Sequence, residues 1–247
     1  MLDSYGRNIH YLRVSVTDRC NLRCQYCMPE EGVQWLPHSR ILSFEQIRDV
    51  VAAAVGLGFD KVRLTGGEPL VRKGIEDLVS MLSGIPGLSH LAMTSNGTLL
   101  APLASVLASN GLRSINISLD TLDPERYASI TRGGKLSDAI DGILEARSVG
   151  LAVKLNVVVS PDSASEQLAA IEAFAQEHGC LVQTIREYRL DEKKRDDERF
   201  MRPPPCYQCD RIRLLATGEL KPCLHGDASI PVDFSDIPGS ILRCIAL

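Results

Sequence analysis

The sequence has no long apolar run and no basic cluster, and each absence excludes a class of protein. No stretch is long and apolar enough to cross a bilayer, and the first residues, MLDSYGRNIH, lack the apolar core of a secretory signal. The net charge is −4, and the charged run at 191–199 mixes both signs, unlike the basic footprint of a nucleic-acid-binding protein. We therefore expect a cytoplasmic protein that binds neither membranes nor nucleic acid.

Apolar, β-rich runs alternate with segments of helical periodicity. The expected strands are 11–16, 61–66, 90–95, 114–119, 153–159 and 181–187. The expected helices are 43–56, 74–83, 101–110, 137–149 and 163–178, and Ser43 is the expected N-cap of the first. This alternation predicts an α/β fold with a parallel sheet and right-handed crossovers. Because a complete barrel has eight such units, six predict a partial (βα)6 TIM-like barrel or a doubly wound sheet.

The alternation stops after Glu187, which predicts three regions. Residues 1–188 form the barrel, 189–205 form a charged, proline-rich connector, and 206–247 form a small cysteine-rich region. The connector ends in RPPP, and prolines restrict a chain to extended or turn conformations.

Three cysteines, Cys20, Cys24 and Cys27, lie within eight residues directly after the first expected strand. In a βα barrel this is the face where active sites collect. A disulfide would use two thiols and leave one over, and a structural zinc site normally has four protein ligands. A four-iron cluster held by three cysteines keeps one iron open for a substrate or cofactor. An iron–sulfur cluster therefore fits this group better than a disulfide, a zinc ion or three packed thiols.

A second cysteine group follows the connector. Cys206 and Cys209 form a C-x2-C knuckle, and thirteen residues separate them from Cys223. The intervening residues predict a β-hairpin that returns Cys223 to the knuckle. A zinc ribbon and a second iron–sulfur cluster both fit this spacing, with Cys244 or another group as a possible fourth ligand. Cys180, at the end of a helical pattern, is expected to be a packed thiol.

The C-x3-C-x2-C pattern, with Tyr26 before its last cysteine, resembles the signature of radical S-adenosylmethionine enzymes. The GGEP sequence at 66–69, after the second expected strand, supports the resemblance. In that superfamily this stretch holds the methionine end of S-adenosylmethionine, and two glycines let a backbone approach a ligand closely. Within the superfamily, six blocks resemble the GTP 3',8-cyclase family of molybdenum-cofactor biosynthesis. They are LRVSVTDRCNLRCQYCMP, KVRLTGGEPLVRK, TSNG, INISLD, VKLNVVV and CYQCDRIRLLATGELKPCL.

The resemblance implies a role for each matching position. Cys20, Cys24 and Cys27 would hold the first, catalytic cluster, and Cys206, Cys209 and Cys223 would hold a second. Tyr26, Gly66, Gly67, Glu68, Pro69 and Ser118 would bind S-adenosylmethionine. Arg13, Arg63, Thr94, Lys154, Arg211 and Arg213 would bind the nucleotide. The resemblance implies S-adenosylmethionine and two [4Fe-4S] clusters as cofactors, GTP or another small molecule as substrate, and an electron donor such as a flavodoxin or ferredoxin. The 5'-deoxyadenosyl radical would take the C3' hydrogen of the ribose, and the carbon radical would close onto C8.

The cations also support a nucleotide site independently of the resemblance. Arg13, Arg63 and Lys154 lie on expected strands, and a buried cation is costly without an anionic partner. Cations that converge inside a barrel would suit a triphosphate, because arginine matches phosphate geometry. For each of these residues taken singly, an ordinary salt bridge or a surface-pointing side chain is the favoured interpretation, and the side of the strand that carries Arg211 and Arg213 is consistent with solvent exposure.

The sequence departs from the family pattern at three points. The connector is short, Gln183 occupies a position where the family has an arginine, with Arg186 as a nearby substitute, and the C-terminal glycine pair of the family has no counterpart in ILRCIAL. We expect that these departures affect cyclisation more than nucleotide binding. Two alternatives to a GTP cyclase therefore stay open: a related maturase acting on a peptide, a protein or another cofactor, and a zinc-binding scaffold without radical chemistry.

Overall fold

The computed structural model describes residues 1–159, 165–187 and 205–247, which form one open, nine-stranded sheet. The strand order is β6-β5-β4-β3-β2-β1-β7-β8-β9. The strands are β1 (Tyr11–Ser15), β2 (Lys61–Thr65), β3 (His90–Ser95), β4 (Ser114–Ser118), β5 (Ala152–Val159), β6 (Leu181–Arg186), β7 (Arg211–Leu214), β8 (Glu219–Lys221) and β9 (Ile230–Pro231). All six expected strands are therefore present, in the predicted order.

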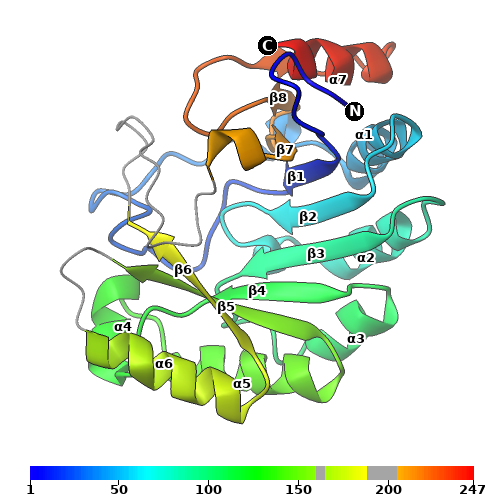
Figure 1. Ribbon diagram of the computed structural model, residues 1–247. Helices are drawn as coiled ribbons and strands as arrows, with labels where there is room; N and C mark the ends of the chain where they lie inside the picture. Colours follow the sequence, from blue (N-terminus) through cyan, green and yellow to red (C-terminus); the bar gives the residue numbers. More distant parts are fainter. Residues whose placement is uncertain (160–164, 188–204) are drawn as a thin grey trace.

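The helices lie along one face of this sheet, as Figure 1 shows for α1 to α6. They are α1 (Phe44–Gly56), α2 (Ile75–Ser83), α3 (Ala104–Ser109), α4 (Pro124–Thr131), α5 (Leu136–Ser148), α6 (Ser165–Glu177) and α7 (Ile237–Ala246). Strands β1 to β6 pair in parallel with their sequence neighbours. A doubly wound sheet would carry helices on both faces, so the fold is the predicted partial (βα)6 barrel.

Alternation along the strands separates the core from the concave face of the sheet. On β1, Leu12 and Val14 are fully buried, and on β2 the same is true of Val62 and Leu64. Because successive side chains of a strand point to opposite faces, the residues between them, among them Arg13 and Arg63, face the concave side. The apolar core therefore fills the space between sheet and helices and leaves the concave face to polar side chains.

Local signals account for most helix boundaries. Ser43 caps α1 in a capping box, since its hydroxyl accepts from the Gln46 amide and the Gln46 side chain accepts from the Ser43 amide. Helix α3 begins three residues later than expected, because turns precede it. Helix α4 was missed, although Asp123 caps it and Pro124 occupies its first turn, which is a recognised helix-start signal.

The cysteine-rich region continues the barrel sheet. Strand β7 pairs in parallel with β1, and β8 pairs antiparallel with β7, which confirms the predicted hairpin. Helix α7, which the sequence analysis missed, packs against α1, β8 and β9 and carries the fully buried Cys244 in its core-facing side. Cys244 is therefore a core residue, and the possibility that it is a fourth ligand was wrong.

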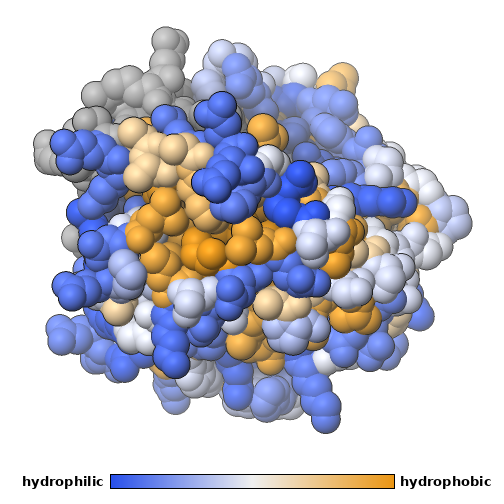
Figure 2. Space-filling view, turned by 90° about the horizontal axis from the view of Figure 1, so that it is seen from below, coloured by the Kyte–Doolittle hydropathy of each residue, from blue (hydrophilic) through white to orange (hydrophobic). Residues whose placement is uncertain are grey.

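The remaining expectations concern the connector and the surface. The predicted connector lies outside the described residues except for Pro205, and the division into three regions stays a prediction. The longest described helices have 13 residues, and none of the described helices could span a bilayer. Seen from below, apolar residues gather in one area of the surface with hydrophilic residues around it (Figure 2).

Candidate functional site

The first cysteine loop leaves the carboxyl end of β1, as predicted. Cys20 and Cys24 are half-buried, Cys27 is exposed, and all three are free thiols. The amides of Cys27 and Met28 both donate to the Cys24 carbonyl at 3.0 Å, which forms a tight turn. Burial is the main cause that raises the pKa of Cys24 to about 12 and that of Cys27 to about 11. These thiols are therefore protonated at neutral pH until a metal replaces the protons.

The two glycines of GGEP pack against the backbone of this loop. The Gly67 amide donates to the Thr17 carbonyl at 2.8 Å, and the Glu68 amide donates to the Arg19 carbonyl at 2.7 Å. A Cβ at Gly67 would lie 2.2 Å from the Arg19 oxygen, and one at Gly66 would lie 2.6 Å from the Thr17 oxygen. From the sequence, the two glycines are explained by a close approach of their backbone to a ligand. In the structure their backbone also packs closely against residues 17–19, which lead into Cys20.

Glu68 joins the carboxyl ends of β2 and β3. Its buried carboxylate accepts from the Leu70 amide at 3.0 Å, the Ser95 hydroxyl at 2.9 Å and the Asn96 amide at 2.6 Å. The Asn96 side chain in turn lies 3.9 Å from the Cys20 sulfur. Burial raises the pKa of Glu68 against these donors. Glu68 therefore positions Asn96 beside the first cysteine loop. Asn96 belongs to the TSNG block, but the sequence alone indicated no role for it.

The Tyr26 side chain reaches the carboxyl end of β4, where Ser118 lies. The Tyr26 hydroxyl donates to Asp120 at 2.7 Å, and Asp120 also accepts from the Val158 amide at 2.8 Å. Asp120 follows β4, and Ser118 is the last residue of that strand. Pro69 begins a buried 3-10 turn after β2. The predicted S-adenosylmethionine residues therefore gather at the carboxyl ends of β1, β2 and β4, and Asp120 is an anchor that the sequence did not reveal.

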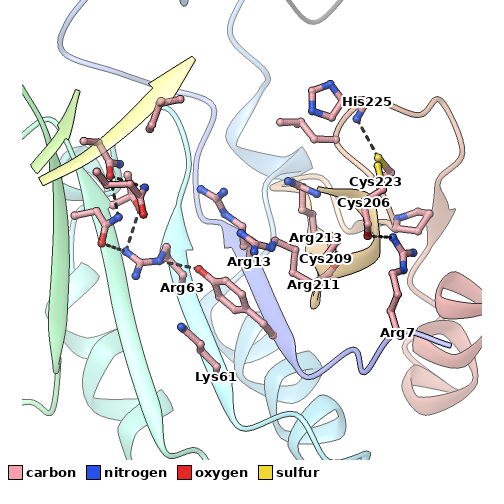
Figure 3. Close-up of a pocket in the computed structure, with 18 of the residues that line it drawn as sticks. Arg7, Arg13, Lys61, Arg63, Cys206, Cys209, Arg211, Arg213, Cys223 and His225 are labelled. Atoms are coloured by element: carbon pink, nitrogen blue, oxygen red, sulfur yellow. Dashed lines mark hydrogen bonds between the residues drawn. The ribbon is translucent and has the colours of Figure 1, made fainter. Parts of the chain in front are cut away.

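The second cysteine group faces the concave side of the barrel. Cys206, in the 3-10 turn Cys206–Gln208, joins Cys209 and Cys223 at one wall of a cavity of about 220 Å³. The strands opposite supply most of the remaining lining (Figure 3). The hairpin has thus brought Cys223 back to the knuckle, as the spacing predicted.

The cavity is lined by cations from four strands and the N-terminal segment. They are Arg7, Arg13, Lys61, Arg63, Lys154, Arg211 and Arg213, and none of the described lining residues is an aspartate or glutamate. Strand register explains the convergence. Arg13 lies beside Arg63 on one side and Arg213 on the other, and Tyr11 lies between Lys61 and Arg211. Arg7 and Lys61 were not predicted, because their position depends on chain tracing and register.

Arg63 is held by neutral hydrogen-bond partners. Arg63 donates to the Tyr11 hydroxyl at 2.7 Å, and to the Met93 carbonyl and the Asn116 side chain at 2.8 Å each. The side chain of Arg13 has neither a hydrogen bond nor an ion pair with any described residue. Burial, and then the neighbouring Arg213 and Arg63, lower its pKa to about 10.

Arg211 and Arg7 have carboxylate partners, and these two carboxylates lie outside the described cavity lining. Arg211 forms an ion pair with Asp210 at 2.8 Å. Arg7 pairs with Asp3 at 2.6 Å and donates to the Cys206 carbonyl at 3.2 Å (Figure 3). Arg211 therefore has a carboxylate partner in the free protein, supplied by its own chain neighbour.

A row of amides continues the cavity wall toward β6. The Asn156 oxygen accepts from the Asn116 side chain and from the Gln183 side chain, both at 3.0 Å. Thr94 also lies on this wall, 3.4 Å from Arg63. Gln183 therefore faces the cavity at the position where an arginine was expected. Arg186 lies an odd number of residues further along β6 and is not part of the lining, so it does not replace that arginine.

Each cysteine group offers three free thiols. Among the described residues, no three histidine, cysteine or acidic side chains converge closely enough to hold one metal ion. Thiolates that share one zinc stand close together, whereas those of a cubane bind separate irons and stand farther apart. The three cysteines of the first group therefore suit the thiolate ligation of an iron–sulfur cluster.

The fold is a parallel partial barrel with three cysteines after β1 and a glycine pair packed beside them. These features are typical of radical S-adenosylmethionine enzymes, and comparison with known proteins supports this class. The model of the radical SAM superfamily matches residues 14–175. A GTP 3',8-cyclase of Peptoclostridium acidaminophilum is 39% identical over 288 aligned positions, covering 98% of this chain and 87% of that protein. A GTP 3',8-cyclase of Pelotomaculum thermopropionicum is 42% identical, and the alignment covers 93% of this chain and 86% of that protein.

The chain therefore belongs to the radical S-adenosylmethionine superfamily and, within it, to the GTP 3',8-cyclase family. It is thus an enzyme of a class that uses S-adenosylmethionine and an iron–sulfur cluster, and the zinc-scaffold interpretation was wrong for the first cysteine group. The alignment of 288 positions exceeds the 247 residues of this chain, so the Peptoclostridium relative has internal residues that this chain lacks.

Solved structures confirm the fold. Streptococcus suis SuiB bound to S-adenosylmethionine has a TM-score of 0.73 at 14% identity, covering 96% of this chain. This chain spans 63% of the length of that protein. The structure described as native anSMEcpe with bound AdoMet has a TM-score of 0.62 at 14% identity, covering 88% of this chain and 75% of that one. At these identities the likeness concerns the fold alone.

Proposed function

We propose that this chain binds GTP in the cationic cavity and carries out the radical chemistry of a GTP 3',8-cyclase, the first step of molybdopterin formation. The observation that carries the proposal is the cavity itself. It lies between the barrel and the second cysteine group, is lined by cations from several strands, and has no carboxylate in its described lining. A triphosphate would suit such a lining, because arginine and phosphate form strong charge-assisted pairs.

The first site would be held by Cys20, Cys24 and Cys27. When bound, the cluster and S-adenosylmethionine supply the 5'-deoxyadenosyl radical. The chain itself holds and orients the cluster and S-adenosylmethionine. The backbone amides of Gly67 and Glu68 fix the first cysteine loop from the end of β2. Asp120 holds the Tyr26 hydroxyl at the end of β4. These contacts close the carboxyl end of the barrel around the position of the cofactor.

The second site would be held by Cys206, Cys209 and Cys223 as a second [4Fe-4S] cluster. Three thiolate ligands would leave such a cluster with one iron available to a substrate. The alternative is zinc. Iron and sulfide analysis of a variant with Cys20, Cys24 and Cys27 changed to alanine separates the two. About four irons per chain should remain for a cubane, whereas stoichiometric zinc without iron after anaerobic reconstitution would contradict the second cluster.

Arg13, Arg63, Lys154, Arg211 and Arg213 would bind the phosphates, joined by the newly found Lys61 and Arg7. Arg63 is preorganised for this role, because three acceptors fix its guanidinium before a ligand arrives. Arg13 is the member for which a phosphate would supply a first anionic partner. We also propose that an electron donor such as a flavodoxin or ferredoxin reduces the protein. The proposed location is the cytoplasm.

The direct test is anaerobic incubation of the reconstituted protein with S-adenosylmethionine, reductant and GTP, followed by mass analysis. We expect 5'-deoxyadenosine together with a product derived from GTP. The variant with Cys20, Cys24 and Cys27 changed to alanine should form neither. Production of 5'-deoxyadenosine that is insensitive to GTP, with GTP recovered unchanged, would contradict the nucleotide assignment and favour a maturase with another substrate.

A further inference from the structure

Arg132 has an unusual backbone conformation for its residue type. It follows α4 as the C-cap with φ 53° and ψ 56° and is the one non-glycine residue with positive φ in the described part of the chain. A side chain with a Cβ is strained in this left-handed region, where glycine is the usual residue at the end of a helix. Strain of this kind persists where the surroundings compensate for it, often at functional sites.

The compensation comes from the first cysteine loop. The Arg132 guanidinium donates from one nitrogen to the Arg23 carbonyl at 2.9 Å and to the Met28 carbonyl at 2.8 Å. Arg23 directly precedes Cys24, and Met28 directly follows Cys27. One side chain therefore joins the two ends of the segment that contains both cysteines, and hydrogen bonds to a charged donor are stronger than neutral ones.

The backbone of α4 already fastens the same loop without this side chain. The Arg23 amide donates to the Thr131 carbonyl at 3.2 Å, and the Gln25 amide donates to the Ile130 carbonyl at 2.9 Å. A glycine at position 132 would keep these bonds and remove the strain. The guanidinium is therefore not required for the end of the helix, and its specific contribution is to the segment from Arg23 to Met28.

We propose that Arg132 is a positioning residue for the first cluster. Its left-handed backbone aims the guanidinium at the loop, and the two carbonyl contacts hold the Cys24 and Cys27 sulfurs in the arrangement that a cluster requires. The described contacts of its guanidinium are to backbone carbonyls of the loop. The proposal depends on the first site of a radical S-adenosylmethionine enzyme and is independent of the nucleotide proposed above.

The test measures how long the first site keeps its iron. The full chain with Cys206, Cys209 and Cys223 changed to alanine is loaded anaerobically, so that iron reports only the first site, and is then challenged with a chelator. Arg132→Gly and Arg132→Asn, two residues that tolerate left-handed backbone, should lose iron about 10-fold to 100-fold faster, the range typical for partners of metal ligands. Arg126→Gln, which removes an exposed guanidinium from the same helix, should lose iron at the parent's rate.

Thermal melting of the proteins without iron separates positioning from folding. We expect Arg132→Gly to melt no lower than its parent, because relief of strain offsets the lost hydrogen bonds. Rapid iron loss together with an unchanged melting temperature supports the proposal. Iron retention equal to the parent's in both Arg132 variants overturns it. A melting temperature that falls in Arg132→Asn and Arg132→Gly alike, in proportion to iron loss, overturns it as well, because Arg132 would then serve general stability.

Discussion

At the scale of single residues, the glycine pair of GGEP is required for packing as well as for the ligand binding that the motif predicts. A Cβ at Gly67 would lie 2.2 Å from the Arg19 carbonyl oxygen, so even a methyl group forces the cysteine loop to move. Overpacking of this kind typically costs about 1–3 kcal/mol. The requirement for glycine thus arises from the protein itself as well as from any bound cofactor.

We predict that Gly67→Ala lowers the free energy of unfolding by about 1–3 kcal/mol and reduces the iron content of the reconstituted protein. Gly56→Ala is the matched control, because its Cβ meets nothing within 4 Å at the end of α1. It should be neutral or slightly stabilising, since alanine favours a helix. Denaturant unfolding and iron analysis measure both effects. Equal stability of the two variants would contradict the packing account.

Arg63 is the residue on which the nucleotide proposal can be tested most selectively. Arg63→Met removes a fixed guanidinium and should weaken GTP binding about 10-fold to 100-fold, since one hydrogen bond to a charged group is worth about 1.5–3 kcal/mol. S-adenosylmethionine cleavage without GTP should change little. Arg48→Met, which removes an exposed arginine paired with Asp49 on α1, is the control. Calorimetry that finds equal GTP affinity in both variants would exclude Arg63 from the site.

Candidate residues can be singled out from the sequence where a motif carries them, but not where tertiary structure selects them. The cysteines, GGEP and Arg13 were found from spacing and from the resemblance. Asp120 and Asn96 were missed as site residues, because each acts through a partner distant in the sequence. Gln183 was recognised as a departure, but its place in an amide row became visible only through the register of β5 and β6.

At the scale of elements, β7 is the strand that connects the two halves of the site. It pairs in parallel with β1, and its fully packed Ile212 is 1% exposed. Arg211 and Arg213 flank this residue and enter the cavity from β7. The docking of β7 onto β1 therefore sets the distance between the second cysteine group and the barrel.

We predict that Ile212→Ala weakens both folding and GTP binding. Ile143→Ala, in the fully buried face of α5, should destabilise the protein by a similar amount, about 2–5 kcal/mol, but leave GTP affinity unchanged. Only the first variant loosens a strand that carries cavity cations. Calorimetry at a temperature where both variants are folded makes the comparison. A GTP affinity that falls equally in both would show that β7 has no specific role.

The sequence predicted the order of strands and most helices, because hydrophobic periodicity is local. It did not predict that β7 extends the barrel sheet, because parallel pairing with β1 joins residues about two hundred positions apart in the chain. It also placed no helix over 237–246, although Asp236 caps α7 and Pro238 lies in its first turn. These omissions concern the elements that complete the cavity.

At the scale of the whole molecule, charge is distributed unevenly. The chain has a net charge of −4, yet none of the described residues lining its cavity is acidic. Anions are therefore attracted to the cavity and not to the protein in general. A cavity with this lining should discriminate ligands by the number of phosphates they carry.

We predict that affinity falls from GTP to GDP to GMP, and that rising salt weakens GTP binding more than GMP binding. Each lost phosphate removes charge-assisted contacts, and salt screens the remaining ones only partly inside a cavity. Calorimetry with the three nucleotides at two ionic strengths measures the series. Equal affinities for GTP and GMP would mean that the cations serve another purpose.

The measurement that tests the central claim most directly is hydrogen transfer from the substrate. The reconstituted protein is incubated anaerobically with S-adenosylmethionine, reductant and GTP deuterated at C3', and the 5'-deoxyadenosine is analysed by mass. The account predicts that 5'-deoxyadenosine gains one deuterium, and that GTP deuterated only at C5' gives none. Unlabelled 5'-deoxyadenosine from C3'-deuterated GTP, at an undiminished rate of formation, would contradict the claim that GTP is the substrate held in this cavity.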